Sequence, residues 1–247
     1  MSEDADWDPN WWMKKRDASL ERQQAEAAAA SGVQLGDAFL VVTEGTVTEP
    51  IYFEFLLETL ALSSVSVLVI PGSASDPRHV INTAARVAKE QVRSAAKRKL
   101  SVKDLEKFDH VWAVVDTDVA VRKGFWNDVQ QLATARDVKL AHSTPCFEFW
   151  LLLHLVGYTT RGDLSDGTAA KSSVKHALGF DYSTNEDTAR EAIASLIGKW
   201  PEAVIHAERV RKYHRDAGTK PPANPSTEVD RLVRAINDSM PKYLRKL

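Results

Sequence analysis

Residues 110–118 read HVWAVVDTD, an apolar run followed by two aspartates, and we infer the fold class first from this segment. Such a continuous apolar run is typical of a strand that is buried on both faces of a sheet. The chain contains three further runs of this kind, AFLVVT, SVSVLVI and VKLAHS, at residues 38–43, 64–70 and 138–143. Segments with a helical pattern separate the runs, and this alternation indicates a parallel sheet with helices on both faces. We therefore predict the α/β class, with a four-stranded parallel sheet flanked by helices.

Helices are expected between the strands and through the last third of the chain. One is expected to open near Pro50, and others to cover about residues 78–99, 125–136 and 146–155. After residue 156 the strand pattern stops. The remainder is expected to form helices at about residues 170–178, 186–198, 200–215 and 227–239.

The predicted organisation has three parts. Residues 1–36 form a partly helical N-terminal appendage, residues 37–157 the α/β domain, and residues 158–247 an α-helical C-terminal region. The appendage contains three tryptophans in a polar context: Trp7, Trp11 and Trp12. Because aromatic side chains are usually buried, we expect them to anchor the appendage onto the main body, with a partner-docking arm as the alternative.

The composition limits the class of protein. A chain of 247 residues with 44% hydrophobic content is long enough to bury a full core. It contains no run of about eighteen apolar residues, and its acidic N-terminus lacks the hydrophobic stretch of a signal peptide, so no membrane association is expected. The single cysteine, Cys146, excludes internal disulfides and fits a reducing compartment, which predicts a cytoplasmic protein. The 32 basic and 34 acidic residues nearly balance, which neither requires nor forbids a nucleic-acid partner.

Acidic side chains follow two of the predicted strands at the point where each strand ends. Glu44 comes directly after the first strand and precedes Gly45, and Asp116 and Asp118 end the third. Ligands of open parallel sheets bind beyond the carboxyl ends of the strands, so these side chains are expected to gather at one edge. Asp116 and Asp118, two residues apart in an extended segment, are expected to point to the same side. Because grouped carboxylates need a cation, we predict a Mg²⁺ or Mn²⁺ site formed by Glu44, Asp116 and Asp118.

Each of these acidic residues also has a structural interpretation. Glu44 can be an ordinary turn residue, and the aspartates can cap the helix that follows them. Glu148 lies at the start of an apolar helix near the same edge, where a buried carboxylate needs a partner. This partner can be a metal, a basic residue, a backbone amide or the dipole of the helix itself. The shared placement at one edge favours a single site.

Two basic stretches are candidates for contacts with phosphate groups. Four basic residues at helical spacing share one face of the predicted helix 78–99: Arg86, Lys89, Arg93 and Lys97. A second stretch contains Arg209, Arg211, Lys212, His214 and Arg215. We predict that the first face binds nucleic acid, and the alternative for both stretches is a solvated helix surface.

Several motifs of other enzyme classes are absent. The sequence contains no Walker A motif, so the chain is not itself a P-loop ATPase, and no Gly-x-Gly-x-x-Gly follows a strand. A nucleophile elbow of the type Gly-x-Ser-x-Gly is also missing.

Four segments, in order along the chain, resemble the RloB-like family. They read EGTVTEPIYF, DHVWAVVDTD, STPCFEFWLLLH and NPST, at residues 44–53, 109–118, 143–154 and 224–227. The likeness extends over about residues 38–238. It implies a Toprim-like core, in which a Glu follows the first strand and Asp-x-Asp follows the third.

The resemblance implies roles for individual residues. Toprim enzymes use the Glu as general acid and base and the Asp pair to bind Mg²⁺, which gives Glu44 the acid–base role and makes Asp116 and Asp118 metal ligands. Three further residues are possible supporting residues of the site: Glu49, Glu148 and Asn224. The acids are intact, whereas the chain departs from the family pattern at Val47, Thr117 and Thr144.

Three functions are compatible with the sequence. RloB-like proteins are associated with restriction-modification loci and abortive phage defence, sometimes beside an ATPase partner, which implies a Mg²⁺-dependent nuclease acting on DNA or RNA. The first alternative is a non-catalytic Toprim-like regulatory module that works with an ATPase partner. The second is a phosphatase, because residues 114–119 also resemble the first motif of haloacid dehalogenase-like enzymes, in which the first Asp attacks phosphate. That motif normally stands near the start of the chain, whereas here a strand–helix unit with its own Glu precedes it.

Overall fold

The structure of this 247-residue chain is a computed structural model. It describes residues 37–60, 66–71, 76–97, 108–157, 164–183, 185–240 and 242–247, apart from the side chains of Ser66 and of residues 91–97. The predicted appendage, residues 1–36 with its three tryptophans, lies outside the described residues.

The described residues contain one sheet of five strands in the order β2-β1-β3-β4-β5. The strands are β1 (Ala38–Thr43), β2 (Ser66–Ile70), β3 (His110–Asp116), β4 (Lys139–Thr144) and β5 (Ser226–Thr227). The first four are parallel to one another, as predicted. β5 pairs antiparallel with β4 and was not predicted, so the expected count of four strands and the expected absence of strands after residue 156 are wrong. A strand of two residues is too short to leave an apolar pattern in the sequence.

The predicted helices are present, with one addition. Those that alternate with the parallel strands are α2 (Thr48–Leu60), α3 (Pro77–Lys97), α4 (Asp118–Arg122), α5 (Trp126–Ala135) and α6 (Glu148–Leu155). Those of the C-terminal region are α7 (Gly167–Leu178), α8 (Glu186–Leu196), α9 (Trp200–Asp216) and α10 (Val229–Asp238), with single 3₁₀ turns at Ile197–Lys199 and Lys242–Leu244. The short α4 is the addition. Among the described residues, none of these helices combines the length and the apolar character needed to cross a membrane.

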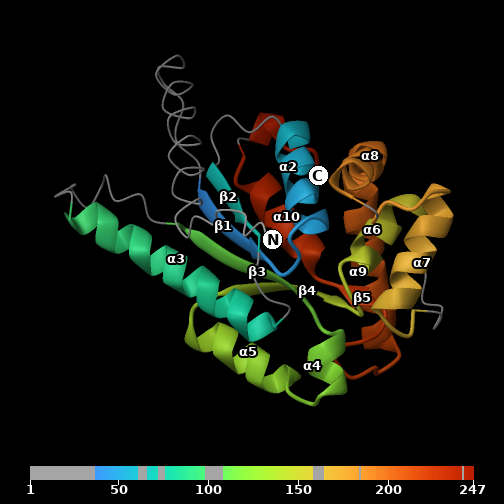
Figure 1. The fold of residues 1–247 in the computed structure, drawn as a ribbon, viewed down its shortest axis with the longest axis horizontal. Helices are drawn as coiled ribbons and strands as arrows, with labels where there is room; N and C mark the ends of the chain where they lie inside the picture. Colours follow the sequence, from blue (N-terminus) through green and yellow to red (C-terminus); the bar gives the residue numbers. More distant parts are fainter. Residues whose placement is uncertain are drawn as a thin grey trace, which may run out of the picture.

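Two hydrophobic cores sandwich the sheet, because successive side chains of each strand point to opposite faces. In β1, Leu40 and Val42 belong to the core that α3, α4 and α5 cover, whereas Phe39 and Val41 belong to the core on the other face. Figure 1 shows α3 and α5 along one side of the sheet and α2, α10 and α6 on the other.

The C-terminal helices share the second core with α2 and α6. Trp200 of α9 is buried in the same cluster as Trp150 of α6. The described residues after 157 therefore pack onto the sheet and contribute β5 to it, instead of forming a separate core. Two of these helices begin with a standard capping group: the Asp166 side chain accepts a hydrogen bond from the Ala169 amide at 2.9 Å at the start of α7, and the Asn185 side chain accepts one from the Thr188 amide at 3.0 Å at the start of α8.

Candidate functional site

Glu44 and Asp116 meet at the carboxyl edge of the sheet. β1 and β3 pair directly. The Glu44 amide donates to the Val114 carbonyl oxygen at 2.9 Å, so the backbone at Glu44 continues the hydrogen bonding between the two strands. The Asp116 amide, at the end of β3, then donates to Glu44 Oε2 at 3.1 Å. Two residues separated by 72 positions are thus in contact, as the edge argument predicted.

Asp116 also ties β3 to the loop before α6. Its Oδ1 accepts a hydrogen bond from the Phe147 amide at 2.9 Å. The carboxylate of Asp116 therefore lies among three elements, the ends of β1 and β3 and the start of α6, on the face of the sheet that α2 and α6 cover.

Asp118 is not extended alongside Asp116, and the prediction that the two point to the same side through strand geometry is wrong. Thr117 has helical dihedral angles (φ −100°, ψ −16°), and α4 begins at Asp118. Asp118 Oδ1 accepts from the amide of its neighbour Val119 at 2.5 Å, which suits a carboxylate in the first turn of a helix. Asp118 nevertheless stays close enough to Glu44 to raise the pKa of that residue.

Glu49 is a buried member of the same group. Its Oε1 accepts from the Gly45 amide at 2.9 Å, which fixes the turn after β1. A Cβ atom at Gly45 would lie 2.0 Å from Glu49 Oε2, so any side chain at position 45 would displace the carboxylate. This contact explains why the chain has a glycine directly after Glu44.

Glu148, at the start of α6, is also buried and has partners from the C-terminal region. The Tyr182 hydroxyl donates to Glu148 Oε1 at 3.2 Å, and Lys171 Nζ of α7 lies 3.8 Å from the same oxygen. The sequence predicted that Glu148 needs a partner but gave no indication of these two, because only the packing of α7 and the following loop against α6 brings them there.

Burial and mutual repulsion raise the pKa values of Glu44, Glu49 and Asp116. Burial is the largest cause for Glu44, and the nearby Glu49, Asp118 and Asp76 add to it, which raises the Glu44 pKa to about 7. Burial, assisted by the charge of Glu148, also raises the Glu49 pKa to about 7. Burial and the charges of Glu49, Glu44 and Glu148 hold the pKa of Asp116 well above its usual value. We call Glu44, Glu49, Asp116, Asp118 and Glu148 the acidic cluster.

The chemistry of the acidic cluster fits a hard divalent cation. Its donors are all carboxylate oxygens, and within the described residues the cation that pairs with the cluster is Lys171, at 3.8 Å. Glu44, Asp116 and Asp118 each direct one oxygen to a backbone amide, and their other oxygens accept no hydrogen bond from the described residues. With the side chains in these positions, no three Asp, Glu, His or Cys side chains of the described residues are arranged to hold a metal. Glu44, Asp116 and Asp118 would hold a metal together only after their side chains change position.

Other predicted site residues lie away from the acidic cluster. Asn224 is exposed and makes no hydrogen bond with the cluster within the described residues. Arg86 and Lys89 are exposed on α3, where Arg86 pairs with Glu90 at 3.2 Å. Since a helix rises about 1.5 Å per residue, Arg86 lies roughly 14 Å along α3 from its first residue. The side chains of the other two predicted residues, Arg93 and Lys97, lie outside the described residues.

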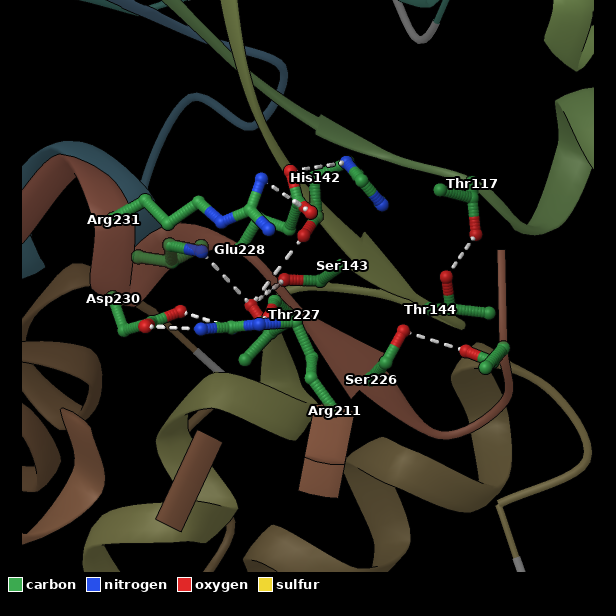
Figure 2. A network of polar contacts seen from close by, with 12 residues as sticks. Thr117, His142, Ser143, Thr144, Arg211, Ser226, Thr227, Glu228, Asp230 and Arg231 are labelled. Carbon is green, nitrogen blue, oxygen red and sulfur yellow. Dashed lines mark hydrogen bonds and ion pairs between the residues drawn. The ribbon is translucent and has the colours of Figure 1, made fainter. Parts of the chain in front are cut away.

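A buried polar network fixes the strand that borders the site. Thr117 Oγ1 donates to Thr144 Oγ1 at 2.8 Å, and the hydroxyls of Ser143 and Thr227 are 2.8 Å apart (Figure 2). These contacts join β3, β4 and β5 side by side. They therefore position the loop that follows β4, whose Phe147 amide holds Asp116.

The same network extends to α9 and α10. Arg211 forms a two-pronged ion pair with Asp230, with 2.6 Å between Nη2 and Oδ2, and its Nη1 also donates to the Thr227 carbonyl oxygen (Figure 2). Asp230 is completely buried, so this pair needs its full set of hydrogen bonds. It fastens the C-terminal helices to β5. The interpretation of Arg211 as part of a solvated helix surface is therefore wrong.

Comparison with known proteins gives one match. The family model described as "RloB-like protein" matches residues 39–236, which is most of the chain and includes the acidic cluster. No significant match was found among curated proteins or among solved structures.

Proposed function

The chain belongs to the RloB-like protein family, and on this premise we propose that it is a metal-dependent nuclease that hydrolyses DNA or RNA phosphodiesters with the acidic cluster. The observation that carries the proposal is the contact of Glu44 with the end of β3, which brings the Glu44 carboxyl group beside Asp116 and supports a proton-transfer role for it. Acidic residues from separate elements are gathered there at a cost in repulsion that a divalent cation would relieve.

We further propose that the core is Toprim-like. This is supported by the positions of the two motifs: Glu44 directly follows β1, and Asp116 ends the neighbouring β3, with Asp118 at the start of α4. In this reading Asp116 and Asp118 hold Mg²⁺ or Mn²⁺, with Glu44 as a third ligand.

When bound, the cation polarises the phosphate and neutralises developing charge. The residues of the chain supply the rest. In the metal-free protein, burial and the neighbouring acids raise the Glu44 pKa to about 7. We assign Glu44 the transfer of a proton from the attacking water to the leaving group. The Phe147 amide orients the Asp116 carboxylate, and Glu49 holds the turn that carries Glu44. Tyr182 and Lys171 hold Glu148 in place within the acidic cluster.

A second candidate is a regulatory module that binds nucleic acid and acts through an ATPase partner. The observation in its favour is that no three ligating side chains among the described residues are arranged to hold a metal. In either case we propose a cytoplasmic role in phage defence, which follows the associations of the family.

The test incubates the full chain with DNA and RNA pools and Mg²⁺ or Mn²⁺, and compares it with Asp116→Ala and Glu44→Gln. Metal-dependent strand breaks by the wild type, lost in both variants, are the expected result. Asp128→Ala, which removes an exposed aspartate of α5, is the matched control and should cut like the wild type.

Calorimetric titration with Mn²⁺ supplies a readout besides activity. We expect the wild type to bind and Asp116→Ala to bind at least about tenfold more weakly, since a ligand is lost. Binding of metal and nucleic acid without cleavage would favour the regulatory module. Undiminished cleavage by Asp116→Ala would remove the catalytic proposal.

A further inference from the structure

A cavity lies beside β4, apart from the acidic cluster. It has a volume of about 370 Å³ and is formed by α5, β4, α9, α10 and the loop before β5. This falls within the range of about 300–1,000 Å³ that is usual for sites of small organic ligands. No carboxylate of the acidic cluster lines it.

The orientation of β4 separates this cavity from the acidic cluster. His142, which lines the cavity, is paired in register with Val115, and its ring lies 5.1 Å from that of Trp126. Val115 and Trp126 belong to the core under α3 and α5, whereas Asp116 turns toward Phe147 on the opposite face. The cavity is therefore a distinct site, and its binding properties do not depend on the proposed nuclease activity.

Three arginines give the cavity a basic lining. Arg211 is committed to Asp230, and Arg231 pairs with Glu228 at 2.8 Å. Arg215 is exposed and has no acidic partner within the described residues. Glu228 is the single acidic residue of the lining, so the arginines outnumber it.

His142 provides an unusual polar group in the wall. Its Nδ1 is buried and makes no hydrogen bond with the described residues, although Glu228 Oε2 lies 3.5 Å away. In Figure 2 the carboxylate of Glu228 lies between the guanidinium of Arg231 and the His142 ring. Glu228 thus occupies the position from which an anion would contact both groups.

We propose that this cavity binds a phosphate-bearing ligand of nucleotide size, with Arg215 and Arg231 as the residues that contact the phosphate. Planar guanidinium groups recognise phosphate through paired charge-assisted hydrogen bonds, and two of them that converge on one cavity favour phosphate over a neutral ligand. The cavity is larger than a phosphate group alone needs. Gln130 and Trp126 in the wall on the α5 side can contact the remainder of the ligand.

Glu228 competes with the ligand for Arg231. The phosphate must displace its carboxylate from Arg231, which weakens binding. Replacing Glu228 with glutamine is therefore expected to tighten binding. A variant with a damaged fold would bind more weakly, so tighter binding cannot be an effect of misfolding.

The test measures binding of AMP, of a 5′-phosphorylated oligonucleotide and of the same oligonucleotide with a 5′-hydroxyl, by calorimetry on the full chain without divalent metal. We expect Arg215→Gln and Arg231→Gln each to weaken binding of the phosphorylated probes about tenfold or more, and Glu228→Gln to strengthen it several-fold. Arg209→Gln is the matched control: it removes an exposed arginine of the same helix as Arg215, outside the cavity lining.

The two phosphorylated probes identify the source of the phosphate. Binding of AMP alone indicates a free nucleotide, and binding of the phosphorylated oligonucleotide in preference to its 5′-hydroxyl form indicates a nucleic-acid end; both results support the site. Failure of every phosphorylated probe to bind overturns it. So does an equal loss of affinity in Arg209→Gln, or a Glu228→Gln variant that binds more weakly than the wild type.

Discussion

Replacing Glu44 with glutamine should stabilise the protein while abolishing its activity. The glutamine keeps a side-chain oxygen that can accept the hydrogen bond from the Asp116 amide, so the contact at 3.1 Å between the two strand ends can persist. What it removes is a charge in a buried position beside Glu49 and Asp118. It also removes the proton-transfer group of the proposed reaction.

The size of the effect follows from the Glu44 pKa, which burial and the neighbouring acids raise from 4.5 to about 7. The folded protein keeps the Glu44 proton up to about pH 7, whereas the unfolded chain releases it near its ordinary pKa. Unfolding free energy is therefore lost as pH rises between these two values, and the full cost, about 3 kcal/mol, is present above the folded-state pKa. Glutamine avoids this cost, so the gain should be largest at about pH 8 and fall below about 1 kcal/mol near pH 5.

Urea denaturation of wild type and Glu44→Gln at these two pH values, without divalent metal, measures the gain. Glu58→Gln is the matched control, since Glu58 is exposed on α2, and its effect should be within about 0.5 kcal/mol at both pH values. The reasoning is refuted if Glu44→Gln is no more stable than the wild type at about pH 8, or if its gain is the same at both pH values.

Three further changes test contacts around the site. Asp230→Ala leaves Arg211 without its buried partner and should cost about 3–5 kcal/mol of unfolding free energy by denaturation, whereas Arg234→Ala, which breaks an exposed pair with Glu208, should cost less than about 1 kcal/mol. Gly45→Ala should push Glu49 out of its place and lower kcat at least about tenfold, while Gly198→Ala, where a Cβ meets no atom within 4 Å, should leave kcat unchanged. Thr227→Val removes the hydroxyl partner of Ser143 and of the Val229 amide and should cost about 1–3 kcal/mol in the same denaturation assay; a change near zero would show that this contact does not hold β5.

The contact between Glu44 and Asp116 could be predicted from the sequence, because the ends of parallel strands meet at one edge whatever the details of the fold. The position of Asp118 could not. The sequence Asp116-Thr117-Asp118 is compatible both with the extended end of a strand and with the start of a helix. In the structure the backbone turns at Thr117. Local patterns of period two or of period 3.6 describe the interior of elements and carry little information on such a junction.

The partners of Glu148 were unpredictable for a different reason. Tyr182 and Lys171 lie in a polar stretch whose sequence has no catalytic pattern, and they reach Glu148 only because α7 packs against α6. Likewise, Arg211 belongs to a basic run that suits a solvated surface, and its burial depends on an aspartate 19 positions later. Side chains that meet through tertiary packing leave no signal in the spacing of either segment.

Lys171 offers a test of how the C-terminal region tunes the acidic cluster. Its ammonium group lies 3.8 Å from Glu148 Oε1 and lowers the pKa of Glu49, although burial keeps that pKa at about 7. Lys171→Gln removes a positive charge that repels a bound cation, so Mg²⁺ affinity at about pH 9 should increase by roughly fivefold, equivalent to about 1 kcal/mol for a half-exposed lysine.

Near pH 6 the gain should be much smaller, since Glu44 and Glu49 are then largely protonated and their protons must leave when the metal binds. Without Lys171 the Glu49 proton leaves less readily, which offsets the reduced repulsion of the cation. Lys175→Gln, one turn further along α7 and paired with Asp181 at 2.8 Å, is the control and should leave Mg²⁺ affinity unchanged. An equal gain at both pH values, or the same gain in Lys175→Gln, would show that Lys171 does not act through the titration of these carboxyl groups.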